Sequence, residues 1–170
     1  MKNKGIVFWI EGYSGSGKTT ISRKIKEKIE LKYGTSILIN GDDIRKIFKL
    51  DDYSKIGRYK VFKKYLSLTK LIIKQNINVI FTVVGLNKKY HQLLKKNFKN
   101  LITILIQSDI KKIKKLGLKK TYGHKKNIIG IHIKPNLPKY QIIIKNDFKK
   151  SLNILSSNLI GKIEKKLIHK

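Results

Sequence analysis

The chain has 170 residues, 41% of them hydrophobic, which fits one globular domain with a sizeable core. Its apolar runs, such as residues 6–10, are far too short to cross a bilayer, and the first residues leave no room for a signal peptide, so we expect a cytoplasmic protein without a membrane partner. The absence of cysteine excludes a disulfide framework and a thiolate metal site.

The net charge of +30 is the most unusual property of the composition. The excess is almost all lysine, since Arg23, Arg45 and Arg58 are the only arginines, whereas sequence-reading nucleic-acid interfaces favour arginine and aromatic stacking. Isoleucine and asparagine are also abundant, as an AT-rich genome would produce. We therefore do not expect nucleic acid to be the main partner, although the charge attracts small anionic substrates.

The first predicted strand covers residues 4–10 and is apolar on both faces, as in a central parallel strand. Directly after it, the pattern G-x-x-x-x-G-K-[ST] is matched at every fixed position by Gly12-Tyr13-Ser14-Gly15-Ser16-Gly17-Lys18-Thr19. Apolar residues at positions 21, 25 and 29 then have helical spacing, and we expect a helix over residues 18–32 that ends at Gly34. This context predicts a site for the phosphates of ATP or GTP.

Each part of this phosphate loop has a chemical role. The glycines let successive N–H groups converge on phosphate oxygens, and the helix contributes its positive N-terminal end. Lys18 would neutralise charge on the β- and γ-phosphates, and the Thr19 hydroxyl would ligate Mg²⁺. The residues expected to bind the nucleotide are Gly12, Tyr13, Ser14, Gly15, Ser16, Gly17, Lys18, Thr19 and Thr20.

The rest of the chain alternates between strand and helix patterns. We predict strands at 36–39, 78–84, 101–106 and 140–144, and helices at 44–48, 55–75, 88–97, 109–116 and 151–170. The alternation predicts an α/β fold in three layers: a five-stranded, mostly parallel sheet with helices on both faces, forming a single domain over residues 1–170. The stretch at about 114–138 is the only one long and irregular enough to be a mobile lid.

Asp42 and Asp43 follow the second predicted strand, on the sheet edge where ligands bind in open α/β folds. A carboxylate there can accept a proton from an attacking hydroxyl or hold Mg²⁺ through water, and we assign this role to Asp42. The alternative is that one of the two aspartates caps the short helix. No acid follows the third strand at 83–85, which favours a small-molecule kinase over a motor NTPase or a GTPase switch.

Arg45 and Arg58 stand out in a chain that otherwise uses lysine. Arg45 lies about one helical turn after Asp42, and Arg58 lies near the start of the next helix. Because a guanidinium fork suits phosphate or sulfate oxygens better than an ammonium does, we expect both to bind the anion of a substrate. Arg23, on the first helix and away from the loop, is expected to be a solvated residue.

The histidines have no spacing typical of a metal site. We expect His91 and His169 at the surface. His124 and His132 fall in the predicted lid, where contact with phosphate is possible.

With these residues in place, the chain resembles the adenylyl-sulfate kinase family. The family pattern F-W-x-x-G-x-S-G-S-G-K-[ST]-T is similar to residues 8–20, and D-G-D-N-[VI]-R is similar to residues 40–45. G-F-S-x-x-D-R is similar to residues 52–58, where Tyr53 keeps the aromatic ring and Arg58 the arginine, and the lid pattern N-F-T-G-I-D is similar to residues 127–132. The Phe8-Trp9 pair makes the resemblance more specific than a phosphate loop alone.

The resemblance implies that ATP, with Mg²⁺, phosphorylates the ribose 3′-hydroxyl of a small nucleotide acceptor whose 5′-phosphate carries a second anionic group. Asp42 would be the base, Lys18 and Thr19 the ATP–Mg²⁺ clamp, and Arg45 and Arg58 the clamp for the acceptor's anion. The residues expected at the acceptor are Asp42, Arg45, Tyr53, Arg58, Lys88 and Ile128. The family also implies a homodimer.

The departures from the family concern the base pocket. Ile128 replaces the phenylalanine that stacks on adenine in the family, a loss of about 1–3 kcal/mol of stacking. The family's I-S-P-[FH]-R after the third strand is replaced by residues 84–88, and the arginine-aspartate before the lid is missing near residues 114–116. The pattern is similar to the divergent members that act on cytidine diphosphoramidate in capsule modification, where a smaller pyrimidine replaces adenine.

Cytidine diphosphoramidate is therefore the expected acceptor, and adenylyl sulfate is the alternative. A nucleoside or polynucleotide 5′-kinase would share the phosphate loop and the acid after the second strand, but no aromatic and basic stripe provides a groove for a chain end. A basic nucleic-acid-binding module that binds ATP without turnover is the non-enzymatic alternative. Steep, salt-dependent DNA affinity would support that alternative.

Overall fold

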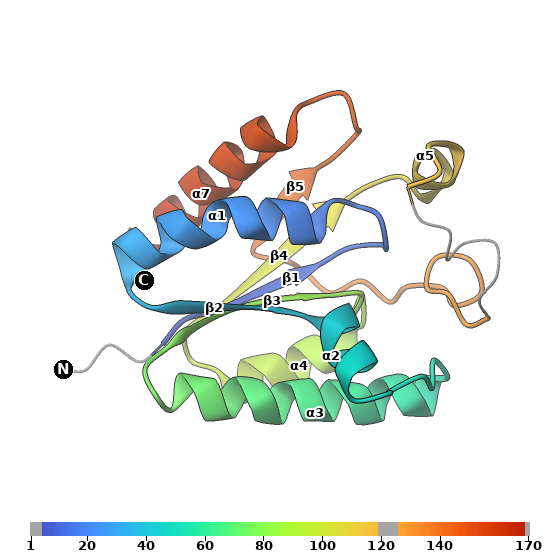
Figure 1. Cartoon of the computed structure of the whole chain (residues 1–170), viewed down its shortest axis with the longest axis horizontal. Coiled ribbons are helices and arrows are strands. Elements are labelled where there is room, and N and C mark those ends of the chain that lie inside the picture. Colours follow the sequence, from blue (N-terminus) through green and yellow to red (C-terminus); the bar gives the residue numbers. More distant parts are fainter. Residues whose placement is uncertain (1–4, 119–125, 169–170) are drawn as a thin grey trace.

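A computed structural model describes residues 5–118 and 126–168 and shows a five-stranded parallel sheet (Figure 1). Its strands are β1 (Val7–Glu11), β2 (Ser36–Asn40), β3 (Asn78–Val83), β4 (Leu101–Gln107) and β5 (Ile142–Lys145), in the order β2-β3-β1-β4-β5. All four pairings are parallel, so the carboxyl ends of the strands meet at one edge. The predicted fold class is confirmed.

Helices cover both faces of the sheet. The helices α1 (Lys18–Tyr33) and α7 (Leu152–Ile168) lie on one face, and α3 (Lys55–Ile73) and α4 (Lys88–Asn97) lie on the other (Figure 1). Successive residues of a strand point to opposite faces, and β1 follows this rule: Phe8 and Ile10 are in the core beneath α1 and α7, whereas Val7 and Trp9 are in the core beneath α3. The apolar run before the phosphate loop is thus the centre of both cores.

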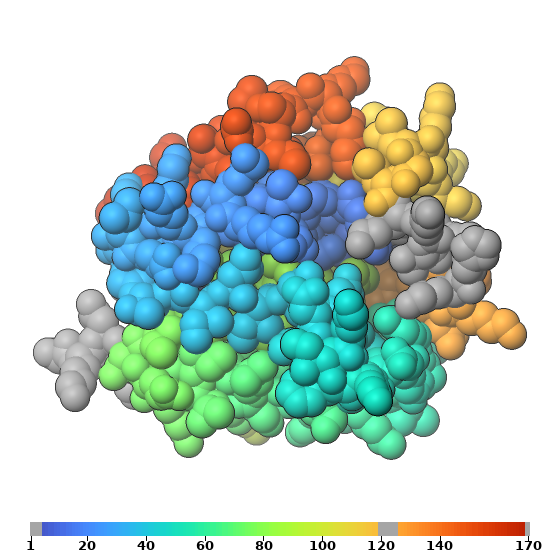
Figure 2. Space-filling view, viewed as in Figure 1, coloured from blue at the N-terminus to red at the C-terminus, as the bar shows by residue number. Residues whose placement is uncertain are grey.

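Short elements stand at the carboxyl edge of the sheet. The helix α2 (Gly41–Ile47) follows β2, and α5 (Ile110–Lys115) follows β4. The space-filling view places α2 at the surface beside α1 and α3 (Figure 2). The described parts of the predicted lid are residues 114–118 and 126–138, and the second part contains turns and isolated bridges at Ile129–Ile133 and Asn87–Asn136. Among the described residues, no helix is long and apolar enough to span a membrane.

Each strand differs from its predicted bounds by one to three residues at one or both ends. The first strand includes Glu11, one residue beyond its predicted end. The last strand begins at Ile142 instead of residue 140, because the side-chain oxygen of Gln141 accepts the Thr103 N–H at 2.7 Å. A side chain thus takes the place of the ladder bond, and regular pairing starts one residue later, at Ile104 with Ile142.

Candidate active site

The carboxyl edge of the sheet carries a cavity of about 700 Å³. Its walls come from segments far apart in the sequence: the phosphate loop, α2, the start of α3, the segment after β3, and residues 126–136. Parallel strands deliver these segments to the same edge, which explains why they meet there. Of the predicted acceptor residues, the cavity wall includes Asp42, Arg45, Tyr53, Arg58 and Ile128.

The phosphate loop has the backbone that its glycines predict. Gly15 and Gly17 have φ values of 81° and 90°, in the left-handed region that favours glycine. A Cβ at Gly12 would lie 2.5 Å from the Ile106 carbonyl oxygen, so only glycine fits there without a shift. The loop ends at α1, whose first residue is Lys18, and the N–H groups of its first turn are available to an anion.

Two side chains of the loop fit a bound phosphate. The Lys18 side chain is buried, and its Nζ donates to the Tyr13 carbonyl at 2.7 Å, so the ammonium is held over the loop. The buried Ser16 Oγ has no hydrogen-bond partner among the described residues, so it is available to a phosphate oxygen. Thr19 is half-buried beside Lys18, whereas Thr20 is exposed on α1.

The described residues can supply only part of the coordination shell of Mg²⁺. Among the described residues, no group of three or more His, Cys, Asp or Glu side chains could hold a metal ion by itself. Mg²⁺ is ordinarily bound in kinases by one or two protein ligands together with substrate phosphates and water. Thr19 is the candidate protein ligand, and Asp42 is the candidate for contact through water.

Two hydrogen bonds hold the backbone at and just before Asp42. The Asn40 side chain accepts the Asp42 N–H at 3.3 Å and is the N-cap of α2, so neither aspartate is the cap. The Tyr65 hydroxyl donates to the Gly41 carbonyl at 2.7 Å. Burial raises the pKa of Tyr65 to about 12, which keeps this hydroxyl protonated as a donor at neutral pH. The Asp42 side chain itself is exposed in the cavity wall, which also includes Asp51.

The guanidinium groups of Arg45 and Arg58 both lie against the ring of Tyr53. Their guanidinium carbons are 4.4 and 5.3 Å from the centre of the tyrosine ring. Arg45 is buried and donates from Nη1 to the Leu50 carbonyl at 2.5 Å. Arg58 donates to the carbonyls of Tyr53 and Asn127, at 3.0 and 2.8 Å.

The electrostatics of this pair favour an anionic ligand. Burial lowers the pKa of Arg58, and the like charge of Arg45 lowers it further. An anion bound between the two guanidinium groups would offset both the burial of the Arg58 charge and its repulsion by Arg45. We call Arg45 and Arg58, which share the ring of Tyr53, the arginine pair.

The remaining predicted residues differ in their positions. Ile128 is buried in the cavity wall, and its N–H donates to Nδ1 of the exposed His132 at 3.1 Å. Lys88 is exposed and does not line the cavity among the described residues, whereas its neighbour Lys89 does. His124 and His169 lie outside the described residues.

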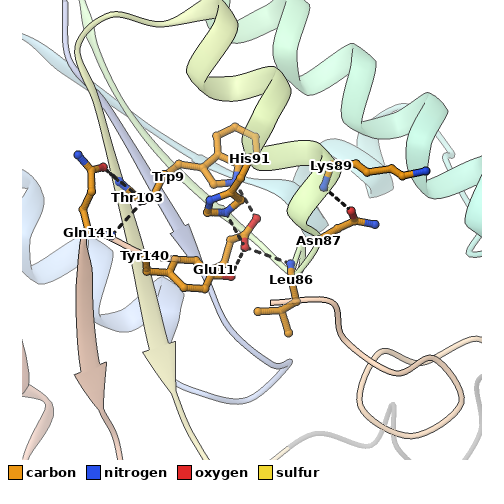
Figure 3. A network of polar contacts seen from close by, with 9 residues as sticks. All are labelled: Trp9, Glu11, Leu86, Asn87, Lys89, His91, Thr103, Tyr140 and Gln141. Carbon is orange, nitrogen blue, oxygen red and sulfur yellow. Dashed lines mark hydrogen bonds and ion pairs between the residues drawn. The ribbon is translucent and has the colours of Figure 1, made fainter. Parts of the chain in front are cut away.

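The expectation that His91 is at the surface is wrong. Its side chain is 2% exposed, and its Nε2 lies 3.1 Å from Oε2 of Glu11. Glu11 is fully buried and also accepts hydrogen bonds from Trp9 Nε1, the Leu86 N–H and the Tyr140 hydroxyl (Figure 3). We call these five residues the Glu11 network.

Sequence reasoning missed the Glu11 network because its partners are distant in the chain. One signal was present: Glu11 follows Val7 and Trp9 on the same face of a strand that is apolar on both faces. An acid at that position is expected to be buried and to need hydrogen-bond donors.

The chain thus has the fold and the phosphate loop of a nucleotide-dependent kinase, and comparisons with known proteins identify its family. The sequence model described as "Adenylylsulphate kinase" matches residues 4–140, so the chain belongs to the adenylylsulphate kinase family. It is therefore an ATP-dependent kinase.

Individual relatives agree with this assignment. Cytidine diphosphoramidate kinase of Campylobacter jejuni is 29% identical over 168 residues, covering 96% of this chain and 99% of that protein. Adenylyl-sulfate kinase of Buchnera aphidicola subsp. Schizaphis graminum is 30% identical, covering 94% of this chain and 83% of that protein. The structure of the Mycobacterium tuberculosis APS kinase CysC in complex with AMPPNP and APS has a TM-score of 0.79 at 18% identity, covering 95% of this chain and 98% of that one, which shows the shared fold.

Proposed function

We propose that this kinase transfers a phosphoryl group from ATP to the ribose 3′-hydroxyl of a pyrimidine nucleotide with a diphosphate-like 5′ group, and that its acceptor is cytidine diphosphoramidate. The observation that carries the proposal is the arginine pair in the wall of a cavity that also holds Asp42. Two guanidinium groups suit an acceptor with two adjacent anionic centres. The Campylobacter relative's name supplies the particular compound.

The residues divide between donor and acceptor. Lys18 and the N–H groups of the loop hold the phosphates of ATP, and Thr19 contributes a ligand to Mg²⁺, which neutralises charge on the transferring group. Asp42 accepts the proton of the attacking hydroxyl. The arginine pair holds the 5′ group of the acceptor and so fixes the distance from its ribose to the loop.

Ile128 supports a pyrimidine acceptor. It belongs to the predicted lid and is buried in the cavity wall, and an aliphatic side chain covers a base without offering a π-face. A purine gains more from stacking than a pyrimidine does. Isoleucine in place of phenylalanine therefore weakens the binding of an adenine acceptor more than that of a cytidine acceptor.

Adenylyl sulfate is the second candidate, and a specific observation favours it. Tyr53, Phe62 and Tyr90 all line the cavity, and the rings of Phe62 and Tyr90 stack at 4.3 Å. These rings provide aromatic surface that is independent of residue 128. We propose Mg²⁺ as the metal, and a homodimer, implied by the family resemblance, stays a prediction.

The experiment is a turnover panel. Purified enzyme is given ATP, Mg²⁺ and one acceptor at a time: cytidine diphosphoramidate, adenylyl sulfate, CDP, thymidine, or a 5′-hydroxyl oligonucleotide. We expect ATP consumption with the first compound and a product phosphorylated at the 3′ position. Turnover on thymidine or on the oligonucleotide alone would contradict the proposal and favour a 5′-kinase.

A further inference from the structure

Glu11 is the only buried acid among the described residues of a chain whose net charge is +30. Its carboxylate receives four donors: Trp9 Nε1 at 3.0 Å on Oε1, and the Leu86 N–H at 3.1 Å, His91 Nε2 at 3.1 Å and the Tyr140 hydroxyl at 2.5 Å on Oε2 (Figure 3). A buried carboxylate with so many donors is an organised site and not a chance burial.

The four donors come from different parts of the fold. Trp9 is in β1, Leu86 follows β3, His91 is in α4, and Tyr140 lies two residues before β5. Glu11 therefore joins the strand that leads into the phosphate loop to three other segments.

The fit around the carboxylate is close. A Cβ at Gly85 would overlap Oε1 of Glu11, so the segment after β3 approaches the acid as closely as glycine allows. Leu86 has φ 45°, an uncommon conformation for leucine, and its N–H points to the carboxylate. The Glu11 network holds this conformation.

The held segment is a wall of the cavity. Trp9, Gly85, Leu86 and Asn87 all line it. The segment also carries the described part of the predicted lid: the Asn136 N–H donates to the Leu86 carbonyl at 3.1 Å, and the Lys88 N–H donates to the Asn136 carbonyl at 2.9 Å. Glu11 thus holds residues 86 and 140 directly and residue 136 through one further hydrogen bond.

The phosphate loop has separate support. The Asn146 side chain donates to the Ser16 carbonyl at 3.0 Å, and the Lys18 ammonium bonds within the loop. Loss of the Glu11 carboxylate therefore releases the segment after β3 before it disturbs the loop.

We propose that Glu11 is a positioning residue for the acceptor: through Leu86 and Tyr140 it fixes the wall formed by residues 85–87 and 136, and so sets acceptor affinity and not ATP affinity. The division into acceptor wall and ATP loop rests on the proposed function.

Glu11→Gln tests this positioning role most directly. Glutamine has the same size, but its amide brings two N–H groups to a site where every neighbour donates, so at least one buried donor loses its partner. Such a loss shifts an equilibrium between the held and the released wall by roughly 10- to 100-fold. We expect the KM for the acceptor to rise about 10-fold or more, and the KM for ATP to stay within about 2-fold.

Asn78→Ala is the matched control. Asn78 is buried at the start of β3, at the opposite end of the strand, where its side chain accepts the Ile6 N–H at 2.8 Å and donates to the carbonyls of Tyr33 and Gly34. Its truncation also breaks a buried polar network, so it lowers the Tm but leaves both KM values unchanged. A Glu11→Gln enzyme that lowers the Tm as this control does, without a change in acceptor KM, would overturn the proposal.

A ligand-free measurement separates this inference from the proposed function. Hydrogen exchange of Glu11→Gln should be accelerated about 10-fold or more in peptides covering residues 84–91 and 128–140, and be unchanged in α1. If wild-type enzyme turns over none of the nucleotide acceptors, the proposed function fails, and exchange still decides the role of Glu11. Unchanged exchange in both segments would refute that role.

Tyr140→Phe keeps the proposal testable if Glu11→Gln does not fold. It removes one donor and leaves the carboxylate and its three other contacts. We expect a rise of roughly 3-fold in acceptor KM, smaller than for Glu11→Gln because only one hydrogen bond is lost. Wild-type acceptor KM in Tyr140→Phe, together with a lowered Tm, would count against Glu11 as a positioning residue.

Discussion

Lys18 is the residue on which the donor site depends most. Its ammonium is buried against the loop at 2.7 Å from the Tyr13 carbonyl, where it can move to the charge on a transferring phosphoryl group. Lys18→Ala should lower kcat by about 10²- to 10³-fold, because a preorganised charge of this kind acts mainly in the transition state.

The control for this prediction is Lys24→Ala, an exposed lysine on the same helix. Both variants should show the circular dichroism of the wild type, and only the first should lose turnover. Retention of more than about a tenth of the wild-type rate by Lys18→Ala would exclude the assigned role.

A substitution at Arg58 tests the proposed binding of the acceptor's anion. Burial and the neighbouring Arg45 lower its pKa, and its guanidinium makes hydrogen bonds to two carbonyls as well as lying beside Tyr53. Arg58→Lys removes the fork and should raise the KM for the acceptor about 10-fold, with the KM for ATP nearly unchanged. Initial rates with one substrate varied at a time measure both values.

Arg23→Lys, an exposed substitution on α1, is the matched control and should change neither value. If Arg58→Lys raised only the KM for ATP, Arg58 would belong to the donor side.

Residues that the sequence identified share one property: their chemistry is local. The phosphate loop is a run of consecutive residues, and its glycine spacing alone predicted the backbone that Gly15 and Gly17 adopt. The contact of His91 with Glu11 joins residues 80 positions apart, so helical or strand periodicity could not indicate it. Lys88 was expected at the acceptor, but Lys89 lines the cavity instead. A match to a motif identifies a residue but not the face of α4 on which its side chain lies.

At the scale of elements, strand and helix types were predictable because each has a periodic apolar pattern, as in β1 and α1. Their ends were less predictable. Glu11 extends β1 by regular pairing with Val83 and Leu105, and β5 starts late because the Gln141 side chain accepts the Thr103 N–H. The segment 126–140 has no period at all, and its course is set by contacts such as the one between Asn136 and Leu86.

Gly130 tests how this segment meets the phosphate loop. Its φ is 92°, and a Cβ there would lie 2.6 Å from Cε1 of Tyr13. Gly130→Ala should therefore cost about 1–3 kcal/mol of stability and also move Tyr13, which raises the KM for ATP. Thermal unfolding and initial rates measure the two effects.

Gly117→Ala separates strain from contact. Gly117 also has a positive φ, 60°, but a Cβ there would meet no described residue within 4 Å. It should lose comparable stability and keep the wild-type KM for ATP. Equal effects of the two substitutions on that KM would show that the contact with Tyr13 has no part in ATP binding.

At the scale of the whole molecule, the net charge of +30 surrounds an acceptor and a donor that are both anions. Long-range attraction should therefore raise substrate capture at low salt. Raising the ionic strength from about 0.01 to 0.1 M shortens the Debye length from about 30 to about 10 Å, and kcat/KM should fall several-fold while kcat at saturation stays constant. Salt-independent kcat/KM would mean that the surface lysines do not act on the cavity.

The central claim is the identity of the acceptor, and a competition measures it most directly. Cytidine diphosphoramidate and adenylyl sulfate are mixed at equal concentration with limiting enzyme and radiolabelled ATP, and the two products are separated. Ile128→Phe is run in parallel, because the added ring should improve the adenine compound and narrow the preference.

We expect the cytidine product to contain about 10-fold more label than the adenine product, or a larger excess, equivalent to roughly 1.4 kcal/mol of transition-state binding. Ile128→Phe should reduce this ratio. If the adenine compound takes most of the label in the wild type, the pyrimidine assignment is contradicted and the chain is an adenylyl-sulfate kinase.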